Sequence, residues 1–434
     1  MIDLDLVRKD PDLYQTACKN KNIPLDVKKF LKADDERRKL IIEVQKMQTE
    51  RNSVSKTMPK LKGPEKENEI KRMKTLGDEL KKQEAALAVL EKRWFEMQLQ
   101  LPSVPLPSVP LGKDENSNKE VRREGQLPTF GYTPKDHVAL GEALDIVDIP
   151  RGVKVSGARS YFLKGDGARF HLAVLRFTLD SLTKKGWTVF SPPLMVQPHY
   201  LMGTGFFPGS EEQIYAVGVQ ASEESKVEGD NLFLIGTSEV SVMGYHADEV
   251  LPLESLPRRY CGYSSCFRRE AGTYGKDTHG LYRIHQFEKV EQVVLCEADQ
   301  DQALKLFEEI RTNAEDVLKA LGLPYRIIDV CTGDMGRGKI FMQDIETWMP
   351  SRNSYGETHS CSYLGDFQTR RLGIRYSDKD GTKKFCHSLN NTCIASPRIL
   401  IPILEMYQNK DGTVTVPEVL RPYFDGQSVI RPKP

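Results

Sequence analysis

Apolar residues recur at alternating steps of four and three along two stretches of the first hundred residues. One stretch covers residues 40–61 and the other residues 73–101, and Pro59 and Pro64 break the helical pattern between them. This spacing predicts two long helices, each with one apolar stripe. Because the break between them is short, the helices must fold back on each other. The pattern therefore predicts an antiparallel two-helix coiled-coil arm over residues 26–101.

A proline-rich segment follows the arm. Residues 101–110 read LPSVPLPSVP, and such a sequence is extended and semi-rigid. We expect a domain boundary here, with an N-terminal domain over residues 1–110 and a second domain over residues 111–434.

The second domain mixes amphipathic helices with runs of alternating strands. Predicted helices cover residues 137–146, 168–184, 299–321 and 399–408. Predicted strands cover residues 186–193, 231–236, 261–269, 281–291, 292–296, 325–330, 344–349 and 358–364. Strands that follow one another in runs predict the α+β class, with a mainly antiparallel sheet flanked by helices.

The two strands over residues 261–269 and 281–291 form a predicted hairpin around a glycine-bearing loop. Period two places Arg268 with Glu270, and Arg283 with Phe287 and Glu291. Two guanidiniums, two carboxylates and an aromatic ring suit a nucleotide phosphate, a flat base and an ammonium group. The same residues could also form a solvent-exposed hairpin with cross-strand ion pairs.

Composition narrows the class of protein. The 434 residues carry a net charge of only +1, no apolar run reaches the roughly 18 residues of a membrane span, and the N-terminus lacks a signal-peptide core. The eight cysteines form no CxxC pair, so buried reduced thiols are expected. We expect a cytoplasmic protein with no membrane partner.

Charge on the arm is less balanced. Residues 26–101 contain 19 Lys and Arg against 14 Asp and Glu, a net charge of +5, and Lys56, Lys60, Lys62 and Lys66 cluster at the bend. Such a run is often only a solvated helix face. An exposed basic arm on a nearly neutral chain also suits a phosphate backbone, and we favour nucleic acid.

Residues 333–339 match the GxxxxGK pattern of phosphate-binding loops. The next residue is Ile340, so the hydroxyl that would hold Mg²⁺ is missing, and a strand pattern follows where a helix is required. These departures argue against a P-loop.

Residues 267–270, Phe-Arg-Arg-Glu, are similar to motif 2 of class II aminoacyl-tRNA synthetases, and residues 270–292 resemble the seryl-tRNA synthetase family. The helix–glycine–strand–proline unit ending at Pro193 resembles motif 1, residues 390–398 stand at motif 3, and the arm resembles the family's tRNA-binding domain. The resemblance spans the chain in order.

The resemblance implies ATP-dependent activation of L-serine and its transfer to tRNA(Ser) by a homodimer. Arg268 and Arg398 are the implied catalytic residues, and Glu357 and Ser360 the implied Mg²⁺ ligands. The implied ATP-binding residues are Arg268, Arg269, Glu270, Arg283, Phe287, Glu357, Thr358, His359, Ser360 and Arg398. The implied serine-binding residues are Thr237, Ser238, Glu239, Arg268, Glu291, Asn390 and Thr392. The lysines at the bend of the arm, Lys56, Lys60, Lys62 and Lys66, are expected to contact tRNA.

Thr237 and Glu239 are predicted to share one strand face, which supports their placement in a common site. Motif 3 departs from the glycine-rich family pattern, with Asn391 and Thr392 near its start and Pro397 before the key arginine. Two rivals remain: a paralogue that passes serine to an acceptor other than tRNA, and an inactive RNA-binding homologue.

Overall fold

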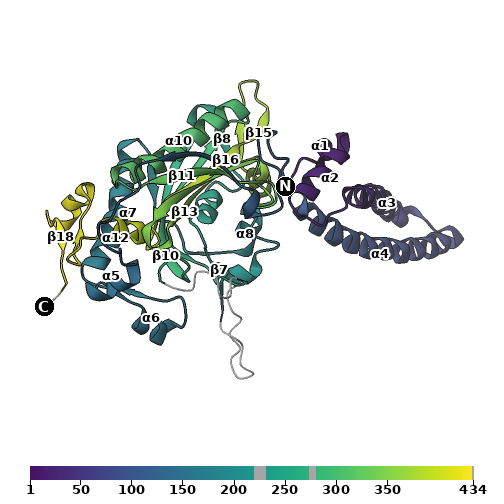
Figure 1. Cartoon of the computed structure of the whole chain (residues 1–434). Helices are drawn as coiled ribbons and strands as arrows, with labels where there is room; N and C mark the ends of the chain where they lie inside the picture. Colours follow the sequence, from purple (N-terminus) through teal and green to yellow (C-terminus); the bar gives the residue numbers. More distant parts are fainter. Residues whose placement is uncertain (219–230, 273–279, 433–434) are drawn as a thin grey trace. The chain divides into compact units, whose positions relative to one another are not determined.

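The computed structural model describes residues 1–218, 231–272 and 280–432. It divides into two compact units, Met1–Val104 and Pro105–Pro434. Each unit is described by itself, with the elements labelled in Figure 1.

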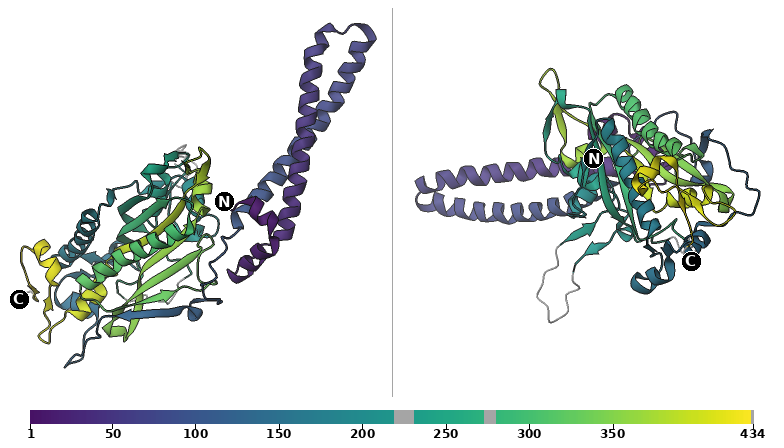
Figure 2. Two further views of the ribbon diagram at one scale, coloured as in Figure 1. Left: turned by 90° about the horizontal axis from the view of Figure 1, so that it is seen from above. Right: turned by 90° about the vertical axis from the view of Figure 1, so that its left-hand side faces the viewer.

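The N-terminal unit is helical. Two short helices, α1 (Leu4–Lys9) and α2 (Pro11–Asn20), precede the long helices α3 (Val27–Thr57) and α4 (Gly63–Gln100). A 3₁₀ turn over Met58–Lys60 joins the long pair, which lie side by side along their length (Figure 2). The predicted antiparallel two-helix arm is confirmed, and the chain turns where Pro59 and Pro64 interrupt the pattern.

A polar cluster fixes the base of the arm. The ring of Trp94 in α4 stacks on Phe30 of α3 with 6.4 Å between centroids, and its Nε1 donates to Asp34 at 3.0 Å. The Asp34 carboxylate is buried and also accepts from Arg8 of α1. Since the three helices meet at one carboxylate, the register of α3 against α4 is fixed at this end.

The second unit is built on an eight-stranded sheet in the order β1-β11-β12-β13-β16-β10-β9-β4. All neighbouring pairs are antiparallel except β4 with β9. The strands are β1 (Lys119–Glu124), β4 (Thr188–Phe190), β9 (Arg258–Phe267), β10 (Gln286–Cys296), β11 (Tyr325–Asp329), β12 (Phe341–Met349), β13 (Ser354–Gly365) and β16 (His387–Ser396). The predicted α+β class and mainly antiparallel sheet are confirmed.

Helices flank this sheet. They are α5 (His137–Ala143), α6 (Ile149–Ser156), α7 (Asp166–Lys184), α8 (Pro198–Thr204), α9 (Glu239–Gly244), α10 (Gln300–Ala320), α11 (Phe367–Leu372) and α12 (Leu400–Met406). The amphipathic α7 and α10 pack on the central strands β10 and β16 and form the main core with them. The smaller sheets contain β2 (Val147–Asp148), β3 (Phe162–Leu163), β5 (Met195–Val196), β6 (Ala216–Val217), β7 (Leu232–Leu234), β8 (Val250–Pro252), β14 (Arg375–Ser377), β15 (Lys383–Phe385), β17 (Val414–Thr415) and β18 (Val429–Ile430).

The predicted hairpin differs from the observed one at both strands. The separate strands predicted over 281–291 and 292–296 are one strand, β10, which begins only at Gln286, so Arg283 precedes it. Strand β9 ends at Phe267, and Arg268 and Glu270 lie beyond it. Beyond the strand, the backbone N–H of Arg269 donates to the carbonyl of Gln213, and Glu270 has a positive φ of 50°, which an extended strand does not adopt. The middle of the predicted loop, residues 273–279, lies outside the described residues.

The prediction that Thr237 and Glu239 share a strand face is also wrong. Strand β7 ends at Leu234, Thr237 lies in the following turn, and Glu239 is the first residue of α9. The hydroxyl of Thr237 accepts from the backbone N–H of Glu239 at 3.3 Å. This local hydrogen bond favours the start of a helix over a continued strand.

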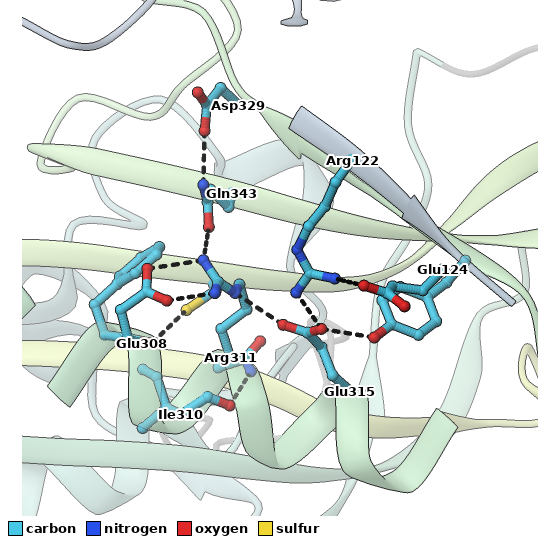
Figure 3. A network of polar contacts seen from close by, with 12 residues as sticks. Arg122, Glu124, Glu308, Ile310, Arg311, Glu315, Asp329 and Gln343 are labelled. Carbon is cyan, nitrogen blue, oxygen red and sulfur yellow. Dashed lines mark hydrogen bonds and ion pairs between the residues drawn. The ribbon is translucent and has the colours of Figure 1, made fainter. Parts of the chain in front are cut away.

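An ionic network holds α10 against the sheet (Figure 3). Arg311 donates to Glu315 at 3.0 Å and to Gln343 of β12 at 2.7 Å. Glu315 also accepts from Tyr325 at 2.6 Å and pairs with Arg122 of β1. Burial alone would raise the pKa of Glu315, but these hydrogen bonds outweigh it and lower the pKa. The helix is therefore tied to three strands by charge as well as by packing.

The cysteines are all buried and unpaired, as expected. Among the described residues, no helix is long and apolar enough to span a membrane.

Candidate active site

A cavity of about 400 Å³ opens on the sheet between strands β10, β13 and β16. Strand β10 contributes Phe287, Lys289 and Glu291 from alternate positions, so they share one face. Loops after β9 and before β12 contribute further side chains. Four residues of the polar face predicted for the hairpin, Arg268, Glu270, Phe287 and Glu291, therefore line a cavity and do not form a solvated ribbon.

Most residues implied by the resemblance line this one cavity. They are Thr237, Glu239, Arg268, Glu270, Phe287, Glu291, Glu357, Thr358, His359, Ser360, Asn390, Thr392 and Arg398. Segments up to about 160 residues apart in sequence are therefore brought together here.

Three of the implied residues are not among the lining. The hydroxyl of Ser238 is buried and donates to the carbonyl of Gly262 at 3.2 Å. The backbone of Arg269 donates to Gln213. Arg283 lies behind Glu270, with 3.2 Å between its guanidinium and that carboxylate.

One wall of the cavity combines a guanidinium with an aromatic face. The guanidinium carbon of Arg268 lies 5.3 Å from the ring centroid of Phe287, and its Nε donates to the carbonyl of Gly236 at 3.3 Å. That hydrogen bond orients the planar donor fork at the cavity wall. Glu270 is fixed beside it by Arg283. One wall therefore offers a guanidinium that can donate hydrogen bonds to a phosphate, a ring face for stacking, and a carboxylate that can accept hydrogen bonds.

Arg398 forms the facing wall. Its Nε donates to the carbonyl of Tyr282 and one terminal nitrogen donates to the carbonyl of Glu357, both at 3.1 Å. The guanidinium carbon lies 4.5 Å from the centroid of the Tyr282 ring. Two backbone acceptors and one ring hold this cation in place.

Two buried carboxylates mark the other end of the cavity. Glu291 pairs with Lys289 at 2.6 Å and accepts from the hydroxyl of Thr392 at 3.1 Å. Glu239 accepts from Asn390 at 2.6 Å and from Gln368 at 2.7 Å. Burial, together with the nearby charge of Glu291, raises the pKa of Glu239. A ligand carrying an ammonium group would relieve this unfavourable charge pair.

A third acidic group lies beneath Glu357 and Ser360. Asp344 of β12 is paired in register with Ser360 of β13, and burial followed by the charge of Glu357 raises its pKa well above the usual range. Its Oδ1 is buried without a hydrogen-bond partner. Oxygen donors around an orphaned carboxylate oxygen fit Mg²⁺. No group of three His, Cys, Asp or Glu side chains suited to a metal occurs among residues 1–218, 231–272 and 280–432.

Burial also determines the charge of His359. It lowers the pKa of this imidazole to about 3, so the ring is neutral at neutral pH. His359 therefore contributes a polar but uncharged surface to the cavity.

The sequence did not single out several lining residues. Tyr282, Lys289, Arg337 and Lys339 all line the cavity. Alternation along β10 could have identified Lys289, because it shares a face with Phe287 and Glu291. The GxxxxGK pattern over residues 333–339 points only to a P-loop and does not predict a place in this cavity. Strand β12 follows this loop where a P-loop requires a helix, so the prediction that the loop is not a P-loop is confirmed. Arg337 and Lys339 of the loop nevertheless line the cavity.

Comparison with known protein families gives two matches that together cover most of the chain. The seryl-tRNA synthetase N-terminal domain matches residues 1–105, and the tRNA synthetase class II core domain (G, H, P, S and T) matches residues 222–407. The serine–tRNA ligase of Deinococcus radiodurans is 48% identical over 430 residues, covering 99% of both chains.

The chain belongs to the seryl-tRNA synthetase family.

Further relatives agree with this membership. The serine–tRNA ligase of Carboxydothermus hydrogenoformans is 43% identical over 98% of both chains. Among solved structures, the seryl-tRNA synthetase of Pyrococcus horikoshii complexed with ATP aligns over the whole of both chains with a TM-score of 0.87 and 36% identity. The cytoplasmic serine–tRNA ligase of Naegleria fowleri in complex with AMP gives a TM-score of 0.84 at 31% identity, over 100% of this chain and 99% of that one.

In motif 3, the residues before Arg398 contact both the cavity and α10. The Ser396–Pro397 peptide bond is cis, and Arg398 follows it directly into the cavity wall. The side chain of Asn391 donates to the carbonyl of Ile310 in α10 at 2.6 Å and does not line the cavity. Asn390 and Thr392, its neighbours along the strand, are the residues that face the site.

Proposed function

We propose that this protein activates L-serine with ATP to form seryl-adenylate and then transfers the seryl group to the 3′ end of tRNA(Ser). The observation that carries the proposal is the single cavity in which Arg268, Phe287 and Arg398 face Glu239 and Glu291. Cations and a ring suit the nucleotide, and the carboxylates suit the ammonium group of an amino acid.

The cavity supports a mechanism of positioning and charge stabilisation. The serine carboxylate attacks the α-phosphorus of ATP in line, and pyrophosphate leaves. Arg268 holds the α-phosphate and the attacking carboxylate, whereas Arg398 binds the γ-phosphate and stabilises the leaving pyrophosphate. Phe287 stacks on the adenine, and Glu270 accepts from its amino group.

Recognition of serine rests on buried polar groups. In this proposal Glu239 and Glu291 bind the ammonium group together with Thr237, and the hydroxyl of Thr392, which donates to Glu291, meets the substrate hydroxyl. A site that hydrogen-bonds a substrate hydroxyl rejects alanine, because its own polar groups would be left without partners.

Mg²⁺ completes the proposed site. Glu357 and Ser360 would hold the ion, which would neutralise phosphate charge when bound. The protein's own residues, Arg268 and Arg398, position the reacting phosphates from both sides.

We also propose that residues 1–110 are the tRNA-binding domain and residues 111–434 the catalytic domain. The net charge of +5 on residues 26–101 supports contact with an RNA backbone. The exposed Val189 on the edge strand β4 and the exposed Leu172 on α7 support a homodimer through these elements.

Serine-dependent exchange of pyrophosphate into ATP tests the adenylation step. The proposal predicts exchange with L-serine and Mg²⁺ that is absent without the amino acid. Lack of exchange with serine, under conditions where the purified protein is folded, would refute it.

A further inference from the structure

A buried histidine outside the cavity contacts the chain just before one of its walls. His137, the first residue of α5, is 7% exposed, and its Nδ1 lies 2.9 Å from Oε1 of Glu405. The backbone N–H of Leu281 donates to its Nε2 at 3.2 Å. Because a peptide N–H can only donate, Nε2 must be unprotonated, and Nδ1 carries the proton that is given to Glu405.

Glu405 of α12 orients this ring. Its side chain is fully buried and also accepts from the backbone N–H and the hydroxyl of Ser351, at 2.9 and 2.8 Å. The backbone N–H of His137 donates to the same carboxylate at 3.0 Å. One carboxylate therefore fixes α5, α12 and the turn between β12 and β13 around the imidazole.

Close approach of the chain to the ring depends on Gly280. This residue has a φ of 77°, and a Cβ built on it would lie 2.0 Å from Nε2 of His137. No other residue type lets the next peptide N–H reach the imidazole without displacing it.

Tyr282, the residue after Leu281, holds the side chain of Arg398 in place. The carbonyl of Tyr282 accepts from Arg398, and its hydroxyl donates to the carbonyl of Glu357 at 3.3 Å. The guanidinium carbons of Arg352 and Arg398 lie 4.3 and 4.5 Å from the centroid of its ring. Any shift of the backbone at Leu281 therefore moves the wall that faces the triphosphate.

We propose that His137 is a positioning residue for ATP. Its neutral imidazole, oriented by Glu405, holds the backbone of Leu281 so that Tyr282 presents Arg398 to the triphosphate. The inference rests on the proposed adenylation activity. His137 itself does not line the cavity, and its effect passes through the backbone of residues 281 and 282.

The test compares His137→Phe with His137→Gln in serine-dependent pyrophosphate exchange by the full chain. Phe keeps the volume of the ring but cannot accept a hydrogen bond from Leu281. KM for ATP should therefore rise roughly tenfold and kcat should fall, whereas KM for serine should stay within about twofold of the wild-type value. Gln can donate to Glu405 and accept from Leu281 at the same time, so it should restore KM for ATP to within about threefold of the wild type.

Ser351→Ala is the matched control. It removes a hydrogen bond to the same buried carboxylate but leaves the contact with Leu281, so it should lower Tm without changing KM for ATP. If His137→Phe does not fold, Gly280→Ala provides the second variant, because its Cβ pushes Leu281 off the ring and should raise KM for ATP selectively.

An unchanged KM for ATP in the folded His137→Phe protein, or in Gly280→Ala if the former does not fold, would overturn the inference. Equal changes in KM for ATP and for serine would overturn it too, since they would indicate a general structural role. Failure of the proposed function is a different result, because the wild-type protein would then show no serine-dependent exchange.

Discussion

In the proposed reaction, the single side chain of Arg268 contacts both ATP and serine. Its Nε donates to the carbonyl of Gly236, and its guanidinium carbon lies 5.3 Å from the centroid of the Phe287 ring. A planar fork held at one nitrogen can present the others to a phosphate and a carboxylate together. A lysine at this position would supply the same charge without the same geometry.

Replacing Arg268 by Lys therefore should reduce the kcat of serine-dependent exchange about 100-fold or more, the usual effect of losing one oriented donor to a transition state. The measurement is exchange at saturating serine and ATP. Arg259→Lys is the control, since Arg259 lies in β9, the strand that precedes Arg268, and pairs with Glu309 at 2.7 Å without lining the cavity. A Lys variant with wild-type kcat would contradict the role given to Arg268.

Glu239 is held in the cavity at a cost to stability. Because burial and the charge of Glu291 raise its pKa, the native state binds a proton more tightly at this carboxyl than the unfolded chain does. The stability that the Glu239 carboxyl contributes is therefore fully present below its pKa in the unfolded chain. It is lost as pH rises from there through the higher pKa of the folded state. A carboxyl whose pKa is perturbed by burial inside a cavity is typical of a functional site, and this fits the proposed contact with the substrate ammonium group.

Glu239→Gln should raise KM for serine roughly tenfold to a hundredfold through loss of a charged hydrogen bond to the ammonium group. The amide oxygen can still accept from Asn390 and Gln368. The variant should therefore fold. Its unfolding free energy relative to that of the wild type should increase from pH 5 to pH 8, because only the wild type has a carboxyl to ionise at this position. Denaturant unfolding at both pH values and serine titration in the exchange assay measure the two effects. An unchanged KM for serine would rule out the ammonium role.

At the scale of elements, heptad spacing and proline breaks sufficed to predict the arm, because α3 and α4 contact mainly each other. Alternation likewise located Phe287 and Glu291 on one face of β10. It failed at Arg268, Glu270 and Arg283, which lie beyond the strand ends. Their positions depend on loop contacts such as the bond from Arg268 N–H to His285, and no periodicity reports these.

Other parts of the site depend on contacts between distant segments. Thr237 and Glu239 reach the cavity from a turn and a helix start, not from the strand that alternation predicted. Lys339 and Tyr282 reach it from loops without a periodic pattern. The family resemblance nevertheless identified thirteen of the lining residues, because a motif records the result of tertiary packing that local rules cannot supply.

The network on α10 gives a prediction about stability. Arg311→Met removes one partner of the buried Glu315 and should lower the unfolding free energy by about 3 kcal/mol. The pKa of Glu315 is lowered in the folded state, so the stability it contributes is present above the unfolded carboxyl's pKa and is lost as pH falls through the folded pKa. The difference between variant and wild type should therefore shrink as pH falls from 7 towards 3. A constant difference across this range would show that packing, and not charge, ties α10 to the sheet.

At the scale of the whole molecule, two units with separate cores divide the proposed work. The main core belongs to the second unit, and the arm contributes no residue to the cavity lining. Adenylation and tRNA binding should then respond to different substitutions.

Changing Lys56, Lys60, Lys62 and Lys66 together to Ala should leave serine-dependent exchange intact and weaken tRNA binding roughly tenfold to a hundredfold at low salt. The salt dependence of binding should also become shallower, because fewer phosphates are neutralised. Filter binding of tRNA at several salt concentrations measures this. If the fourfold variant binds tRNA with the affinity and the salt dependence of the wild type, the bend of the arm does not contact tRNA.

The most direct test of the central claim is aminoacylation of total tRNA by the wild-type protein with each of the twenty amino acids in turn. The account predicts charging with serine alone, and that the charged species is tRNA(Ser). Exchange with serine but no charged tRNA would indicate another acceptor, and charging with a different amino acid, or none, would contradict the account.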